Sequence, residues 1–147
     1  MKSTTMRHIK IRKHSLLVGL YLFFLLGTIS AQSIGPSGVS KVIFFDYETY
    51  NVKPELIETT LIPHAAFLKA NPNSKVSIEA HTDARGGYEY NLSLAQKRAK
   101  AVRSFLLKFG VPSVQIESVS FGSVKPADGG NDEAAFAKNR RVEFFYR

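Results

Sequence analysis

The stretch "EAHTDARGGYEYNLSLAQKRAKAV", residues 79–102, contains the end of one element, a glycine-containing turn and the start of another. Residues 75–81 alternate apolar and polar side chains, which is typical of a half-buried strand. From about Asn91 to Phe109, apolar residues recur at three- and four-residue spacing, which predicts an amphipathic helix. The stretch therefore predicts a strand, a loop over residues 82–90 and a long helix.

The ends of this helix carry recognisable signals. Asn91 or Ser93 is suited to cap the first turn, and Ser93 with Gln96 fits a capping box. Gly110, followed closely by Pro112, predicts the end of the helix.

The remainder of the chain alternates strand and helix patterns. A helical stripe runs from Pro54 to Lys69, with a kink or late start expected at Pro63. Strands are expected at residues 41–46, 115–122 and 141–147, with a short helical turn at 133–138. The order β-α-β-α-β-(short α)-β predicts an α+β domain, a two-layer sandwich with helices packed on one face of the sheet.

The N-terminus has the pattern of an export signal. Residues 1–14 contain five basic residues and no acidic residue, and "SLLVGLYLFFLLG", residues 15–27, is apolar. Small residues follow, so we expect a signal peptide over residues 1–31, cleaved after Ala31. The alternative is an uncleaved N-terminal anchor. Residues 32–40 are rich in Gly, Pro and Ser and are interpreted as a short linker before a domain at 41–147.

Composition excludes several function classes. The chain has a net charge of +8, but without residues 1–31 it has 15 basic and 12 acidic residues, a net charge of +3. This is too little to indicate nucleic-acid binding. Cysteine is absent, which excludes disulfides and thiolate metal sites. We also find no motif for a catalytic site, a metal site or a cofactor, and predict that the protein is not an enzyme. His81 is interpreted as a hydrogen-bonded residue at a strand end.

Asp83 and Arg98 are the charged residues of greatest interest. Asp83 follows the strand directly, and Arg98 lies seven residues after Asn91, on the same face of the helix. Two interpretations are open. One is an Asp–Arg ion pair that joins the strand end to the helix. The other is a site for a ligand that carries both an ammonium and a carboxylate, because Arg binds carboxylates through two parallel hydrogen bonds. Spacing alone favours the ion pair.

A set of motifs resembles a known family. H-T-D at residues 81–83, Y-N-L-S-L with R-A at 90–99, F-G at 121–122 and N-R-R-V at 139–142 occur in the order and spacing of the OmpA-like C-terminal domain family, which binds peptidoglycan. The resemblance covers residues 41–147 and is strongest to the peptidoglycan-associated lipoprotein branch. It implies a mixed sheet and non-catalytic binding of meso-diaminopimelate in the peptidoglycan stem peptide.

The resemblance also implies roles for five residues. Asp83 would receive the ammonium of diaminopimelate and Arg98 its carboxylate, and replacing either should abolish binding with the fold intact. Asn91, Asp46 and Arg140 are expected to line the same pocket.

The family further implies a location and partners. We expect a periplasmic protein associated with the outer membrane or cell wall of a Gram-negative type envelope. The alternative function is an envelope protein–protein interaction, with a Tol-system protein as partner. The branch carries a lipidated cysteine that this sequence lacks, so a soluble periplasmic protein and one retained by residues 15–31 are both open.

Overall fold

The computed structural model describes residues 35–147. The predicted signal segment and the first residues of the predicted linker lie outside this range. The described residues, 35–147, belong to one compact unit. Of the helices within residues 35–147, none has the length and apolar character needed to cross a bilayer. In chain order the elements are β1 (Val42–Phe44), α1 (Pro54–Leu56), the π-helical turn η1 (Ile57–Leu61), α2 (Ile62–Ala70), β2 (Val76–His81), α3 (Tyr88–Lys108), the 3₁₀ turn η2 (Ser113–Gln115), β3 (Ile116–Gly122), α4 (Glu133–Asn139) and β4 (Arg141–Tyr146).

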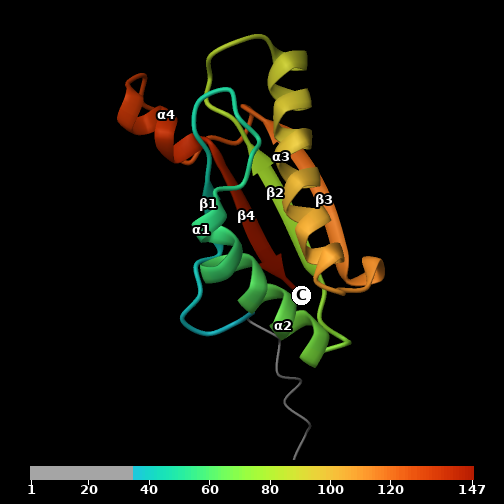
Figure 1. Ribbon diagram of the computed structural model, residues 1–147. Coiled ribbons are helices and arrows are strands. Elements are labelled where there is room, and N and C mark those ends of the chain that lie inside the picture. Colours follow the sequence, from blue (N-terminus) through green and yellow to red (C-terminus); the bar gives the residue numbers. More distant parts are fainter. Residues whose placement is uncertain (1–34) are drawn as a thin grey trace, which may run out of the picture. The chain divides into compact units, whose positions relative to one another are not determined.

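The strands form one mixed sheet in the order β1-β4-β2-β3 (Figure 1). β4 runs antiparallel to both β1 and β2. β2 and β3 are parallel, and α3 makes the crossover between them. The predicted α+β fold with a mixed sheet is therefore confirmed.

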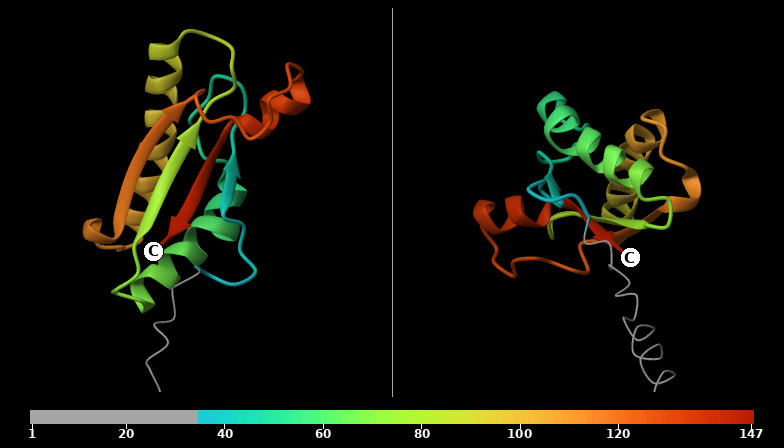
Figure 2. Two further views of the ribbon diagram at one scale, coloured as in Figure 1. Left: turned by 180° about the vertical axis from the view of Figure 1, so that it is seen from behind. Right: turned by 90° about the horizontal axis from the view of Figure 1, so that it is seen from below.

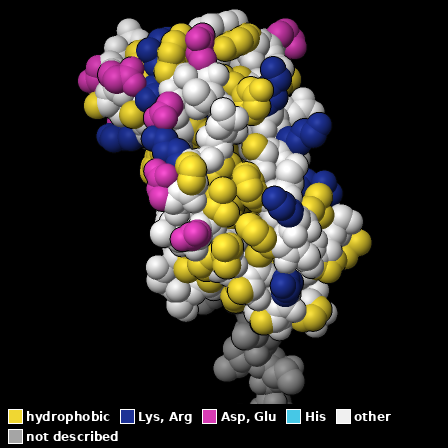
Figure 3. Space-filling model, viewed as in Figure 1, with side chains coloured by type: hydrophobic (Ala, Val, Ile, Leu, Met, Phe, Trp, Pro, Cys, Tyr) yellow, Lys and Arg dark blue, Asp and Glu magenta, His cyan; other side chains and the backbone are white. Residues whose placement is uncertain are grey.

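The core lies between the sheet and the helices on one of its faces. Figure 2 shows α2 and α3 on this face, with the opposite face of the sheet free of helices. α4 lies beyond one end of the sheet (Figure 1). In the space-filling view, hydrophobic side chains gather between α2 and α3, and charged side chains gather around α4 (Figure 3). Fully buried apolar residues come from both layers: Ile43, Leu61, Leu68, Val76, Ile78, Val102, Leu106 and Val142.

The expected irregularity at Pro63 is a π-helical turn. The helical run from Pro54 to Ala70 passes through η1, where the amide of Ile62 donates to the carbonyl of Ile57, five residues back. Pro63 follows in the first turn of α2. Proline has no amide hydrogen and its ring collides with the preceding turn, so a widened turn before it keeps the run continuous.

The start of α3 differs from the prediction. The helix begins at Tyr88, three residues before Asn91, and Gly87 occupies the N-cap position without a side-chain hydrogen bond. The capping box at Ser93 was therefore wrong. The side chain of Asn91 instead donates to the carbonyl of Arg85 at 3.0 Å, which holds the preceding loop against the first turn.

The end of α3 matches the prediction. Gly110 has a φ of +85°, a conformation that favours glycine. Its amide donates to the carbonyl of Leu107 at 2.9 Å, and the amide of Val111 donates to Leu106 at 3.1 Å. These two bonds form a Schellman motif, which closes the helix and turns the chain toward β3.

Two strands are buried to a different extent than predicted. β1 is a short edge strand in which only Ile43 is buried and Phe44 is half-exposed. β2 is buried on both faces rather than one. On the face away from the helices, His81 stacks on Phe121 with ring centroids 5.4 Å apart. His81 is 2% exposed, and neither ring nitrogen has a hydrogen-bond partner within the described chain, so the expectation of a hydrogen-bonded His81 was wrong.

The end of the predicted linker packs on the domain. The carbonyl of Ser40 lies 2.9 Å from Nε2 of His64, a buried residue of α2. Nδ1 of the same ring lies 2.5 Å from the hydroxyl of Tyr146 in β4. The amide of Phe144 in β4 donates to the carbonyl of Lys41 at 2.9 Å, so the segment before β1 is fixed to both layers of the fold.

Candidate functional site

A small cavity opens where the end of β2, the loop after β1 and the first turns of α3 meet. Its lining includes Tyr47 and Glu48 of the loop, Asp83 and Arg85 after β2, and Asn91 and Arg98 of α3. Arg140, between α4 and β4, closes one side. As the side chains stand, the free space is about that of one water molecule.

Asp83 lies at the floor of the cavity and is 3% exposed. Its Oδ1 accepts from the backbone amide and from Nε of Arg85, at 3.1 and 3.2 Å. Its Oδ2 accepts from Nη2 of Arg85 at 2.7 Å and from Nη1 of Arg140 at 3.3 Å. Burial on its own would raise the pKa of Asp83, but the hydrogen bonds from Arg85 and Arg140 outweigh it and lower the pKa. Asp83 is thus a carboxylate with every acceptor position in use.

Arg98 is fully buried and bonds to backbone carbonyls. Nε donates to Thr49 at 2.8 Å, Nη1 to His81 at 2.8 Å and Nη2 to Asp46 at 3.1 Å. Burial first, and then the charge of Arg140, lower the pKa of Arg98 to about 10, so it stays protonated at neutral pH. Arg98 therefore ties the loop after β1 to the end of β2.

Asp83 and Arg98 share the cavity without pairing. The ion pairs of Asp83 within residues 35–147 are with Arg85 and Arg140. The ion-pair interpretation, which spacing alone favours, therefore does not hold for Asp83 and Arg98. Three of the five N–H groups of Arg98 bond to carbonyls, which leaves one on each terminal nitrogen.

Asn91 and Arg140 also reach the cavity. Asn91 is 2% exposed and sits in the first turn of α3. Arg140 donates from Nε to the carbonyl of Phe45 at 3.1 Å, and its Nη2 lies 2.8 Å from Glu133. Four of the five residues proposed from the sequence, Asp83, Arg98, Asn91 and Arg140, thus lie around one cavity.

Asp46 does not line this cavity. Its carboxylate is 69% exposed and pairs with Lys53 at 3.0 Å. Only its backbone carbonyl is turned inward, toward Arg98. The acidic side chain of this loop that does line the cavity is Glu48, which has a φ of +57°, an uncommon conformation for a residue other than glycine. The expectation that Asp46 lines the cavity was wrong. Glu48 could have been considered from the sequence, because it is an acidic residue only two positions further along the same loop.

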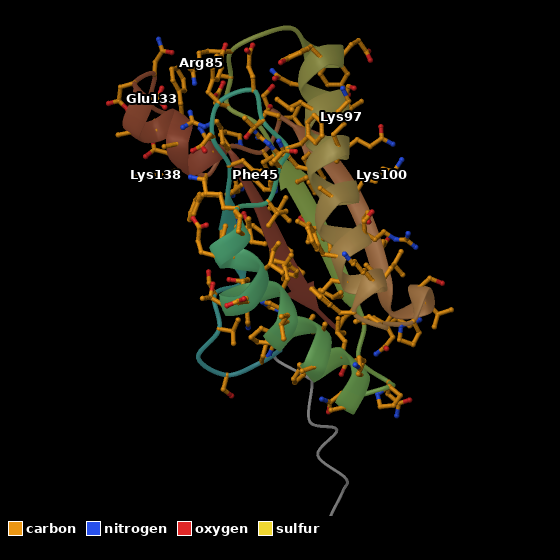
Figure 4. All side chains as sticks on the ribbon, viewed as in Figure 1. Phe45, Arg85, Lys97, Lys100, Glu133 and Lys138 are labelled. Atoms are coloured by element: carbon orange, nitrogen blue, oxygen red, sulfur yellow. The ribbon has the colours of Figure 1, made fainter. Side chains whose placement is uncertain are left out.

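Arg85 lines the cavity and was not expected there from the sequence. Its guanidinium lies between two rings, 4.0 Å from the centroid of Tyr47 and 4.4 Å from that of Phe136. It also lies 3.4 Å from Glu133 of α4. Figure 4 shows Arg85 and Glu133 close together at the end of the sheet, whereas Lys97 and Lys100 lie along α3. One feature of the sequence could have indicated that Arg85 lies near Asp83. Arg85 follows Asp83 by two residues, and an Asp side chain often accepts a hydrogen bond from the backbone amide two residues later.

The family profile that matches this chain describes the OmpA family and covers residues 44–140. The chain belongs to the OmpA family. It is 46% identical to the peptidoglycan-associated lipoprotein of Pasteurella multocida over 104 residues, which are 71% of this chain and 69% of that protein. It is 40% identical to the peptidoglycan-associated lipoprotein of Haemophilus influenzae over 126 residues, 82% of each protein.

Solved structures also support membership of this family. The crystal structure of the peptidoglycan-associated lipoprotein from Burkholderia pseudomallei has a TM-score of 0.71 and 42% identity, and the match covers 74% of this chain and 91% of that one. The C-terminal domain of Helicobacter pylori MotB has a TM-score of 0.67 at 21% identity, a likeness of fold alone. The resemblance identified from the sequence motifs is therefore confirmed.

Proposed function

We propose that this OmpA-family domain binds peptidoglycan without catalysis, and that the cavity receives the free end of meso-diaminopimelate in the stem peptide. The proposal extends to a periplasmic location in a Gram-negative type envelope. Its support from relatives is that the similar proteins of P. multocida, H. influenzae and B. pseudomallei are peptidoglycan-associated lipoproteins.

One observation carries the chemistry of the proposal. A buried carboxylate, Asp83, and a buried guanidinium, Arg98, face one small cavity without bonding to each other. The free end of meso-diaminopimelate carries an ammonium and a carboxylate on the same carbon. The ammonium suits Asp83, and the carboxylate suits the two N–H groups that Arg98 has left.

The rigidity of the site also favours binding. Arg98 is held by three carbonyls from two different segments, so its guanidinium is already oriented before a ligand arrives. Orientation before binding reduces the entropy lost when the complex forms. Glu48 adds a second carboxylate at the mouth, which increases the attraction for an ammonium group.

The test is co-sedimentation of residues 32–147 with purified sacculi. Protein should pellet with sacculi that contain meso-diaminopimelate, and free meso-diaminopimelate should release it. Sacculi with lysine at this position should retain little protein, because lysine has the ammonium but lacks the neighbouring carboxylate.

Substitutions locate the interaction. Asp83→Asn should reduce retention at least tenfold, because the ammonium loses a charged acceptor. Asp128→Asn is the matched control, since Asp128 pairs with Lys138 at 2.7 Å and is not part of the cavity lining. Equal retention of wild type and Asp83→Asn on meso-diaminopimelate sacculi would refute the proposed site.

A further inference from the structure

The proposed function meets an obstacle in the structure, because Asp83 has no free acceptor position. Its two oxygens accept four hydrogen bonds, three from Arg85 and one from Arg140. A carboxylate offers about four such positions. An ammonium therefore reaches Asp83 only if an existing donor leaves.

We propose that the side chain of Arg85 occupies the ammonium position in the empty protein, and that ligand binding displaces it. This inference rests on the proposed function and concerns how the site is regulated. Arg85 then acts as an internal competitor, which weakens binding and makes it depend on the state of the loop after β2.

Arg85 is the donor best able to leave. Its side chain is 34% exposed, whereas that of Arg140 is 9% exposed. Arg140 is also bound to the carbonyl of Phe45. The backbone amide of Arg85 holds Asp83 at 3.1 Å independently of the side chain. When the guanidinium moves out, Asp83 stays oriented and regains one acceptor position on each oxygen.

Displacement of Arg85 also affects α4. The guanidinium contacts the ring of Phe136 and lies 3.4 Å from Glu133, and both residues belong to α4. α4 has few residues and lies beyond the end of the sheet (Figure 1). The same guanidinium bonds Asp83 and contacts Glu133 and Phe136, so its departure from Asp83 changes its contacts with α4. Occupation of the cavity is thereby communicated to α4.

The experiment measures the affinity of residues 32–147 for free meso-diaminopimelate by calorimetric titration. Arg85→Gln removes the competing charge and should tighten binding about three- to tenfold. Glu133→Gln changes no cavity-lining residue and weakens the hold on Arg85, so it should tighten binding by a smaller factor. It also removes a partner of Arg140, which keeps its bond to the carbonyl of Phe45. Lys138→Gln is the charge-matched control for Arg85→Gln, because Lys138 pairs with Asp128 and does not line the cavity.

The outcomes separate the two proposals. Weaker binding by Arg85→Gln means that Arg85 contacts the ligand, and it overturns the competitor proposal while the proposed function stands. Unchanged affinity in both Arg85→Gln and Glu133→Gln also overturns it. Absence of binding by the wild type and every variant refutes the proposed function itself. If Arg85→Gln does not fold, Glu133→Gln decides alone, together with the amide NMR shifts of α4, which should change when ligand is added to the wild type.

Discussion

Replacement of Arg98 by lysine should destabilise the domain strongly, although it keeps the charge. The guanidinium reaches three carbonyls, those of Asp46, Thr49 and His81, with three different nitrogens. The ammonium of lysine is a single atom with a shorter reach, so we expect it to retain one of these contacts. Two hydrogen bonds from a charged donor are lost, and each contributes about 1.5–3 kcal/mol.

The net loss of stability is smaller than the sum of the two lost hydrogen bonds, because the site is partly exposed. The carbonyls of Asp46 and Thr49 lie in a partly exposed loop, where water replaces part of the lost bonding. We therefore expect the free energy of unfolding to fall by about 2–4 kcal/mol, a large share of the 5–15 kcal/mol typical of a domain. The earlier expectation that removal of Arg98 would leave the fold intact does not agree with this burial.

Urea unfolding at neutral pH measures the effect. With an m-value of about 2 kcal/mol per molar, the midpoint should fall by about 1–2 M. Arg103→Lys is the control, because Arg103 lies on the same helix, is partly exposed and has no hydrogen-bond partner for its side chain within residues 35–147. Its free energy of unfolding should change by less than about 0.5 kcal/mol, a midpoint shift below about 0.25 M. A loss below about 1 kcal/mol for Arg98→Lys would refute the reasoning that Arg98 holds the loop.

Two further predictions concern stability. A Cβ on Gly122, at a φ of +53°, would lie 3.1 Å from the amide nitrogen of Leu92, whereas one on Gly110, at +85°, would make only ordinary contacts, 3.9 Å from the flexible side chain of Lys69. Gly122→Ala should therefore lower the free energy of unfolding by about 2–3 kcal/mol and Gly110→Ala by about 1 kcal/mol, as measured by urea unfolding; equal losses would contradict the steric argument. Burial, and then the charge of Arg141, lower the pKa of His81 to about 4 from the usual 6.5. As the pH falls, His81 takes up its proton in the unfolded chain before it does so in the folded one. The stability that neutral His81 gives the fold is therefore complete above pH 6.5 and is lost as the pH falls toward 4. The unfolding midpoint should decline over this range, and less steeply in His81→Asn.

The types of element were predictable because their periodicity is a property of the side chains. The three- and four-residue spacing of α3 and the alternation of β2 follow from which residues face the core. The start of α3 was not predictable in the same way. Gly87 offers no capping side chain, and Tyr88 begins the helix because the side chain of Asn91 fixes the loop before it. Its acceptor is a backbone carbonyl, a group that every residue type has, so the residue types do not show where the bond forms.

Hydrogen bonds to backbone carbonyls also explain why Asp46 was assigned to the cavity and Glu48 was missed. The path of the loop after β1 depends on Arg98, which draws in the carbonyls of Asp46 and Thr49. With its carbonyl turned inward, Asp46 directs its carboxylate to Lys53, and the positive φ of Glu48 brings that side chain to the cavity. Arg98 therefore shapes the site and is also expected to contact the ligand. Loss of binding in an Arg98 variant does not separate these two effects, whereas Asp83→Asn and Arg85→Gln act on the ligand position and leave the three carbonyl bonds of Arg98 in place.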